Sequence, residues 1–235
     1  MKRILTLGVF AGLFAMMMVS CGNKSNQHAD SDETEVQTGD LLFVGLPYDY
    51  DLYDSTSTDR PVVSDTRDEN DTVNYIHVAI LERDENDRLW IVDATLRRGV
   101  DRYPLDTFLL NFTLNDGTLP QLDVMRLKDN ADAAAYVANA RQFCGHPYDI
   151  CFGASTDSLY CSELVRDAYV SASGEHVFSE APISFKSSDG SFPLYWQQLF
   201  GLMKQPIPQD KMGTTPSAMI KESCLKYVGP LKVNR

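Results

Sequence analysis

The stretch Tyr160-Cys161-Ser162-Glu163-Leu164-Val165 places a cysteine where a polar loop gives way to apolar residues of helical period. Asp157 or Ser158 can cap the expected helix, and Gly174 can end it. Cys161 then lies in the first turn, where free N–H groups and the positive end of the helix dipole favour its thiolate. The cysteine is therefore a candidate nucleophile. The alternative is a small buried apolar side chain at a helix start.

A nucleophilic thiol needs a general base beside it, and the run Tyr75–Glu82 carries the candidate, His77. This run and Leu89–Thr95 are apolar and β-branched, and the charged residues between them predict a hairpin. With a three-residue loop, paired position numbers add to 170, which puts His77 directly opposite Asp93 at about 5 Å between Cβ atoms. Asp93 would then orient the imidazole. The alternatives are a half-buried histidine and an edge-strand charge.

The first residues have the pattern of a secretory signal. Two basic residues precede an uninterrupted apolar run, Ile4–Val19, which is too short for a comfortable membrane span. The residues before Cys21 resemble the lipobox of bacterial lipoproteins, which implies cleavage before this cysteine and its lipidation by acyl chains such as palmitate. An uncleaved anchor or a plain signal peptide are the alternatives. The resemblance predicts a lipid-anchored protein of the bacterial cell envelope, facing the periplasm or the outside.

Composition divides the chain into three parts. The segment after Cys21 is polar and free of aromatic residues, so it cannot bury enough apolar surface to fold. We expect a signal peptide at 1–20, a disordered tether at 21–38 and one folded domain at 39–235. The formal net charge of −12 argues against a nucleic-acid partner and against docking on an anionic membrane, so the lipid anchor is the expected membrane contact.

The remaining cysteines bear on disulfides and metals. If Cys161 stays a thiol, at most one bridge forms among Cys144, Cys151 and Cys224, and the short loop between the first two favours that pair. Spacing alone leaves the pairing open. No His/Cys pattern with zinc spacing occurs, so we expect no metal and no cofactor.

Five motifs occur in an order that resembles a known group of enzymes. They are Gly39-Asp40-Leu41-Leu42-Phe43, Tyr75-Ile76-His77-Val78-Ala79-Ile80, Val92-Asp93-Ala94, Gly145-His146-Pro147-Tyr148-Asp149 and Tyr160-Cys161-Ser162-Glu163-Leu164-Val165. The chain resembles the circularly permuted NlpC/P60 group, the YiiX/YebB-like cysteine hydrolases of the papain-like superfamily. This resemblance implies an α+β fold with a small antiparallel sheet packed against helices.

The same resemblance assigns roles to residues. It implies Cys161 as nucleophile, His77 as base and Asp93 as the orienting third residue, and it places Tyr148 and Tyr160 near the cleft as substrate-binding candidates. Relatives often carry Glu at the third position and Ser before the histidine, so the third role departs from the usual pattern.

The implied activity is hydrolysis of amide bonds through an acyl-enzyme, by a cysteine peptidase or amidase acting on peptide- or amide-containing substrates such as peptidoglycan fragments. Two alternatives remain open: a lipid-directed acyltransferase or esterase of the lecithin:retinol acyltransferase type, and a non-catalytic binding domain.

Overall fold

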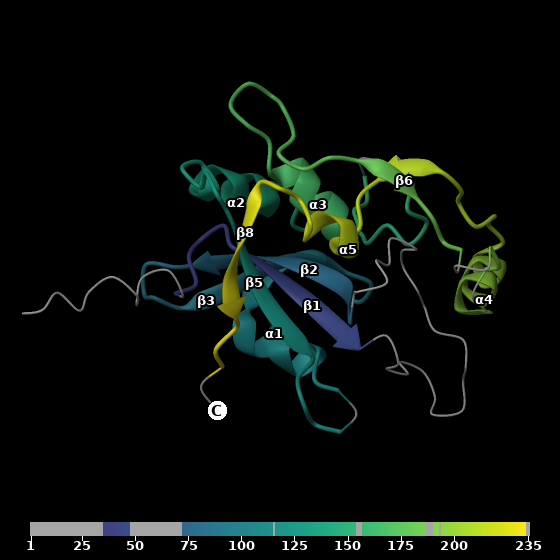
Figure 1. Ribbon diagram of the computed structural model, residues 1–235, viewed down its shortest axis with the longest axis horizontal. Coiled ribbons are helices and arrows are strands. Elements are labelled where there is room, and N and C mark those ends of the chain that lie inside the picture. Colours follow the sequence, from purple (N-terminus) through teal and green to yellow (C-terminus); the bar gives the residue numbers. More distant parts are fainter. Residues whose placement is uncertain are drawn as a thin grey trace, which may run out of the picture.

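The computed structural model describes residues 35–47, 72–114, 116–153, 157–186, 190–192 and 194–233 (Figure 1). The expected signal peptide, Cys21 and most of the expected tether lie outside the described residues. Within the described part, no helix is long and apolar enough to cross a membrane.

A six-stranded sheet forms the centre of the domain, and each neighbouring pair of strands is antiparallel. The order across the sheet is β4-β3-β2-β1-β5-β8. The strands are β1 (Leu41–Pro47), β2 (Val73–Arg83), β3 (Leu89–Thr95), β4 (Gly99–Pro104), β5 (Gln121–Leu127) and β8 (Leu225–Pro230). Strand β1 lies near the middle and is buried on both faces, which explains its continuous apolar sequence.

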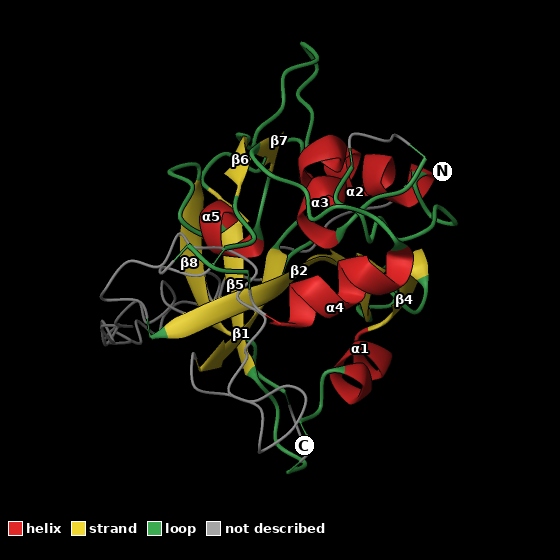
Figure 2. Ribbon diagram, turned by 90° about the vertical axis from the view of Figure 1, so that its right-hand side faces the viewer, coloured by secondary structure: helices red, strands yellow, loops and turns green. Residues whose placement is uncertain are grey.

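Helices cover both faces of the sheet (Figures 1 and 2). The helices α2 (Ala133–Gln142), α3 (Cys161–Ala168) and α5 (Pro216–Met219) lie on one face, and α1 (Leu105–Asn111) lies on the other. Each layer has its own apolar core, one centred on α2 and α3 and one on α1. This arrangement confirms the expected α+β class with an antiparallel sheet packed against helices.

An arm beyond α3 carries the two-stranded sheet of β6 (Ala181–Ile183) and β7 (Lys211–Gly213), and the helix α4 (Leu194–Met203). The arm buries a third cluster, in which Phe185 packs edge-on against Trp196 with ring centroids 5.1 Å apart. Tyr160, the residue before α3, belongs to this cluster. The arm is thereby fixed to the start of α3.

The folded part begins before the expected boundary at residue 39. The Thr38 hydroxyl donates to the Arg83 carbonyl at 3.2 Å, and the Arg83 N–H donates back to this hydroxyl at 3.0 Å. Arg126 forms a buried ion pair with Asp40 at 2.6 Å and also donates to the Glu35 carbonyl. Hydrogen bonds and the packing of Val36 against the α1-side core hold residues 35–38, and the polar composition of the preceding segment did not reveal either contact.

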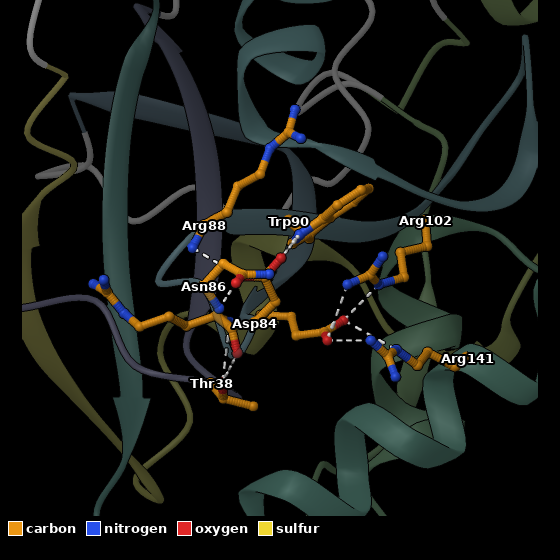
Figure 3. Close-up of polar contacts among 9 residues, drawn as sticks. Thr38, Asp84, Asn86, Arg88, Trp90, Arg102 and Arg141 are labelled. Atoms are coloured by element: carbon orange, nitrogen blue, oxygen red, sulfur yellow. Dashed lines mark hydrogen bonds and ion pairs between the residues drawn. The ribbon is translucent and has the colours of Figure 1, made fainter.

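The hairpin between β2 and β3 has a longer loop than expected. Paired position numbers add to 172, as for Ile80 with Val92, and not to 170. Asp84 sets this loop: its carboxylate accepts from the backbone N–H groups of Asn86 and Arg88, both at 2.9 Å, and from the Trp90 indole at 2.8 Å (Figure 3). The prediction that His77 lies directly opposite Asp93 is therefore wrong. A shift of two positions keeps both side chains on the same face and makes them diagonal neighbours.

A cluster of charges joins this hairpin to the neighbouring elements. Glu82 of β2 is buried and accepts from the guanidinium of Arg102 in β4 at 2.8 Å and from that of Arg141 in α2 at 3.0 Å (Figure 3). The Arg102 guanidinium also lies over the Trp90 ring, 3.9 Å from its centroid. These contacts tie β2, β3, β4 and α2 together behind the hairpin loop.

Candidate active site

His77 and Asp93 meet where the pairing of β2 with β3 ends. The two strands pair through Ile80 and Val92, and His77 and Asp93 lie beyond this last pair. The Nε2 atom of His77 is 2.9 Å from Oδ2 of Asp93, and the Asp93 side chain is 0% exposed. The residue before His77, Ile76, has no partner on β1, because Val44 pairs with His77 and Gly45 pairs with Tyr75. This shift in register is a β-bulge. Bulges next to functional sites commonly re-aim a side chain.

Cys161 is the first residue of α3 and is 6% exposed. The helix packs on both β2 and β3, which brings its start to His77. Burial lowers the pKa of His77, but the charge of Cys161, the hydrogen bonds with Asp93 and Cys161, and the charge of Asp93 together raise it to about 10. Because Nε2 faces Asp93, the ring nitrogen left for Cys161 is Nδ1. The raised pKa favours the protonated form of the His77 ring, which lies between Asp93 and Cys161.

The helix α3 begins at Cys161, and its N-cap is Tyr160 instead of the expected Asp157 or Ser158. Tyr160 is the N-cap, with an extended backbone, and its N–H group donates to the Glu163 carboxylate at 3.3 Å. The N–H groups at the start of a helix have no acceptor within the helix, so they point out beside the Cys161 side chain. The helix ends at Ala168, well before the expected Gly174.

Comparison with known proteins places this geometry in a family. The model of the family described as "Permuted papain-like amidase enzyme, YaeF/YiiX, C92 family" matches residues 35–229. The chain belongs to this family of permuted papain-like amidases.

A solved structure described as metalloprotein yiiX from Escherichia coli O157:H7 is similar to this chain, with a TM-score of 0.60. It is 22% identical, and the match covers 83% of this chain and 97% of that chain. At this level of identity the likeness concerns the fold, and it agrees with the permuted papain-like architecture. Among curated proteins, no significant match to the chain was found.

The two tyrosines expected as substrate-binding candidates lie in different settings. The Tyr160 hydroxyl is buried and accepts from the Thr214 N–H at 3.2 Å, and burial raises the pKa of this phenol far above its usual value. Tyr160 thus holds the arm against α3. Tyr148 is half-buried, pairs with Leu159 in a parallel bridge and contacts both the α2–α3 core and the arm cluster. Of the two, Tyr148 is the more accessible to solvent.

A hydroxyl that sequence reasoning missed completes the polar contacts of Asp93. Tyr103 of β4 donates to Oδ2 of Asp93 at 2.9 Å, and Phe112 lies against His77 with ring centroids 5.0 Å apart. Tyr103 pairs with Ile91, two positions from Asp93, so it is a diagonal neighbour across β3 and β4. Predicting the contact of Tyr103 with Asp93 would have required the register of β4 against β3. The sequence after Thr95 lacks a clear alternating pattern from which that register could be derived.

The expected disulfide is wrong. Cys144, Cys151, Cys161 and Cys224 are all free thiols. Between the first two, the chain runs alongside β4, where the Gly145 N–H donates to the Val100 carbonyl at 2.8 Å, and then forms the bridge at Tyr148. In the described part of the chain, no group of three or more His, Cys, Asp or Glu side chains could hold a metal ion.

Proposed function

We propose that this family member is a cysteine amidase in which Cys161 attacks the substrate carbonyl, His77 acts as general acid and base, and Asp93 orients the imidazole. The observation that carries the proposal is the contact of one buried imidazole with both the thiol at the start of α3 and the Asp93 carboxylate. A thiolate is the reactive form of cysteine, and an adjacent imidazolium stabilises it.

The reaction follows from this arrangement. The Cys161 thiolate adds to the amide carbonyl, and the N–H groups at the start of α3 stabilise the oxyanion. The His77 imidazolium then gives its proton to the leaving amine, and an acyl-enzyme remains. The neutral imidazole next takes a proton from water, whose oxygen attacks the thioester. The acid is released, and the thiolate and imidazolium are restored. Asp93 fixes the orientation of the ring throughout.

The substrate proposal rests on the N-terminal sequence. A lipid anchor at Cys21 would place the domain in the bacterial cell envelope, where peptidoglycan peptides supply amide bonds. We therefore assign peptide amides of the envelope as the substrate class. Membrane contact is through the lipid anchor only, and nucleic acid is not a partner.

The test compares the mature protein with Cys161→Ala on purified muropeptides and on envelope extracts, with released products identified by mass spectrometry. A matched control is Cys144→Ala, because Cys144 is another half-buried free thiol and is not among the groups that shift the pKa of His77. New amine and carboxylate products with wild type and the control, and none with Cys161→Ala, are expected. Equal turnover by Cys161→Ala would exclude the mechanism. Release of fatty acid or transfer of an acyl chain, without muropeptide cleavage, would favour the lipid-directed alternative.

A further inference from the structure

The Asp93 carboxylate has an unequal environment on its two oxygens. Oδ2 lies 2.9 Å from both the His77 Nε2 atom and the Tyr103 hydroxyl. The other oxygen, Oδ1, is buried, and among the residues that the structure describes no donor reaches it. A buried carboxylate with few donors binds strongly to those it has, because electrostatic attraction is stronger in the protein interior than in water.

Tyr103 is held firmly in place on the far side of this carboxylate. Its side chain is 4% exposed, and the Arg98 guanidinium lies over its ring at 4.6 Å from the centroid. Burial, with the charge of Asp93, raises the pKa of the phenol far above its usual value. The phenol therefore stays protonated at physiological pH and donates a hydrogen bond to Asp93 throughout.

We infer that Tyr103 is a positioning residue of the Cys161 site, whose hydroxyl fixes the carboxylate oxygen that faces His77 and weakens the hold of Asp93 on the imidazolium proton. A hydrogen bond to a carboxylate withdraws part of its negative charge. With Tyr103 in place, His77 can release its proton to a leaving amine more readily than it could if Asp93 accepted no hydrogen bond from Tyr103. The effect on turnover rests on the function proposed above, whereas the effect on His77 does not.

The direct test is the titration of His77 in Tyr103→Phe. The chain has four histidines, so ¹⁵N-histidine labelling gives few signals, and loss of one signal in His77→Gln assigns His77. We expect the midpoint of His77 to rise by about half a pH unit or more, because Asp93 keeps only one donor. An unchanged or lowered midpoint would overturn the inference.

A matched control separates this effect from the loss of any buried tyrosine hydroxyl. Tyr169 is fully buried, and its hydroxyl donates to the Gly39 carbonyl at 2.9 Å, the same distance as in the Tyr103 bond. Tyr169→Phe should lose a similar hydrogen bond and leave the His77 midpoint at its wild-type value. A rise of the same size in both variants would mean that Tyr103 has a structural role only.

A second variant keeps the test decisive if Tyr103→Phe fails to fold. Placing 3-fluorotyrosine at position 103 keeps the shape and the hydroxyl but makes the phenol a stronger donor. It should shift the His77 midpoint downward, the opposite of Tyr103→Phe. A midpoint that does not move with the stronger donor would also overturn the inference.

Turnover gives a further, separable readout. In Tyr103→Phe, kcat should fall about three- to tenfold with KM unchanged, because a more tightly held proton is donated more slowly to the leaving amine. If no amide substrate is cleaved by wild type, the proposed function fails while the titration still decides the role of Tyr103. If wild type cleaves amides but the titration midpoint of Tyr103→Phe equals that of wild type, the inference alone fails.

Discussion

Replacing Asp93 by Asn tests the third member of the site with little change in shape. The carboxylate is fully buried and contributes to the raised pKa of His77 through both a hydrogen bond and its charge. Asn keeps an oxygen and the hydrogen-bonding geometry but loses the charge. Two of the causes that raise the pKa are weakened or lost, while burial continues to lower it, so the His77 midpoint should fall below about 10.

The size of the effect follows from one charge-assisted hydrogen bond. Such bonds contribute about 1.5–3 kcal/mol, which corresponds to about 10- to 150-fold in a rate. We expect kcat/KM of Asp93→Asn on an amide substrate to fall within this range, with most of the loss in kcat, because the carboxylate acts on His77 and not on the substrate.

Two measurements check this expectation together. The first is kcat/KM across pH 5–10, and the second is the histidine titration described for Tyr103. In Asp93→Asn the high-pH limit of activity should move down with the His77 midpoint. Activity within about twofold of wild type, with an unmoved midpoint, would refute the idea that Asp93 supports the imidazolium. A large loss of activity without a midpoint change would show that Asp93 orients the ring but does not set its charge.

Three further predictions concern stability. The folded-state pKa of His77 is about 10 and lies above its unfolded value of 6.5. Its contribution to the free energy of unfolding is therefore fully present below pH 6.5 and is lost as the pH rises toward about 10. Urea titrations of wild type should show this decline, and those of His77→Gln should not. Gly39→Ala places a methyl group 2.6 Å from the Ala133 Cβ atom at a φ of +85°, and should lower the free energy of unfolding in urea by about 1–3 kcal/mol. Arg126→Met leaves the Asp40 carboxylate buried without its cation and should cost about 3–5 kcal/mol in the same assay; a loss of about 1 kcal/mol or less, as for an exposed ion pair, would contradict the buried ion-pair account.

Local signals along the sequence were easier to interpret than the geometry that depends on strand register. A cysteine at the start of a helical pattern is visible in the sequence because capping and periodicity are local properties. The position of its cap was missed, since Tyr160 fills the N-cap through its backbone and a bond from its N–H group to Glu163, and not through a side-chain acceptor.

The hairpin shows why register is harder to predict than strand identity. The apolar runs gave both strands, but the loop length depended on the hydrogen bonds of Asp84 with Asn86, Arg88 and Trp90. The error was two positions, so the face of each side chain was preserved and the contact of His77 with Asp93 survived as a diagonal pair. An error of one position would have put the two groups on opposite faces. The contact of Tyr103 with Asp93 could not be predicted for the same reason, because it depends on a second register, that of β4.

The pairing of β2 with β3 ends at Ile80 and Val92, and His77 and Asp93 contact each other beyond this point. Had β2 and β3 continued to pair past Ile80 and Val92, backbone hydrogen bonds and apolar side chains would have closed the space between them. Instead β3 continues its pairing with β4 through Thr95, and the polar pair His77 and Asp93 spans the opening beside the start of α3. Cysteine and histidine therefore meet because a helix start faces a gap at the edge of one hairpin. The order of the two residues along the chain does not affect this meeting, which explains how a permuted chain can build a papain-like site.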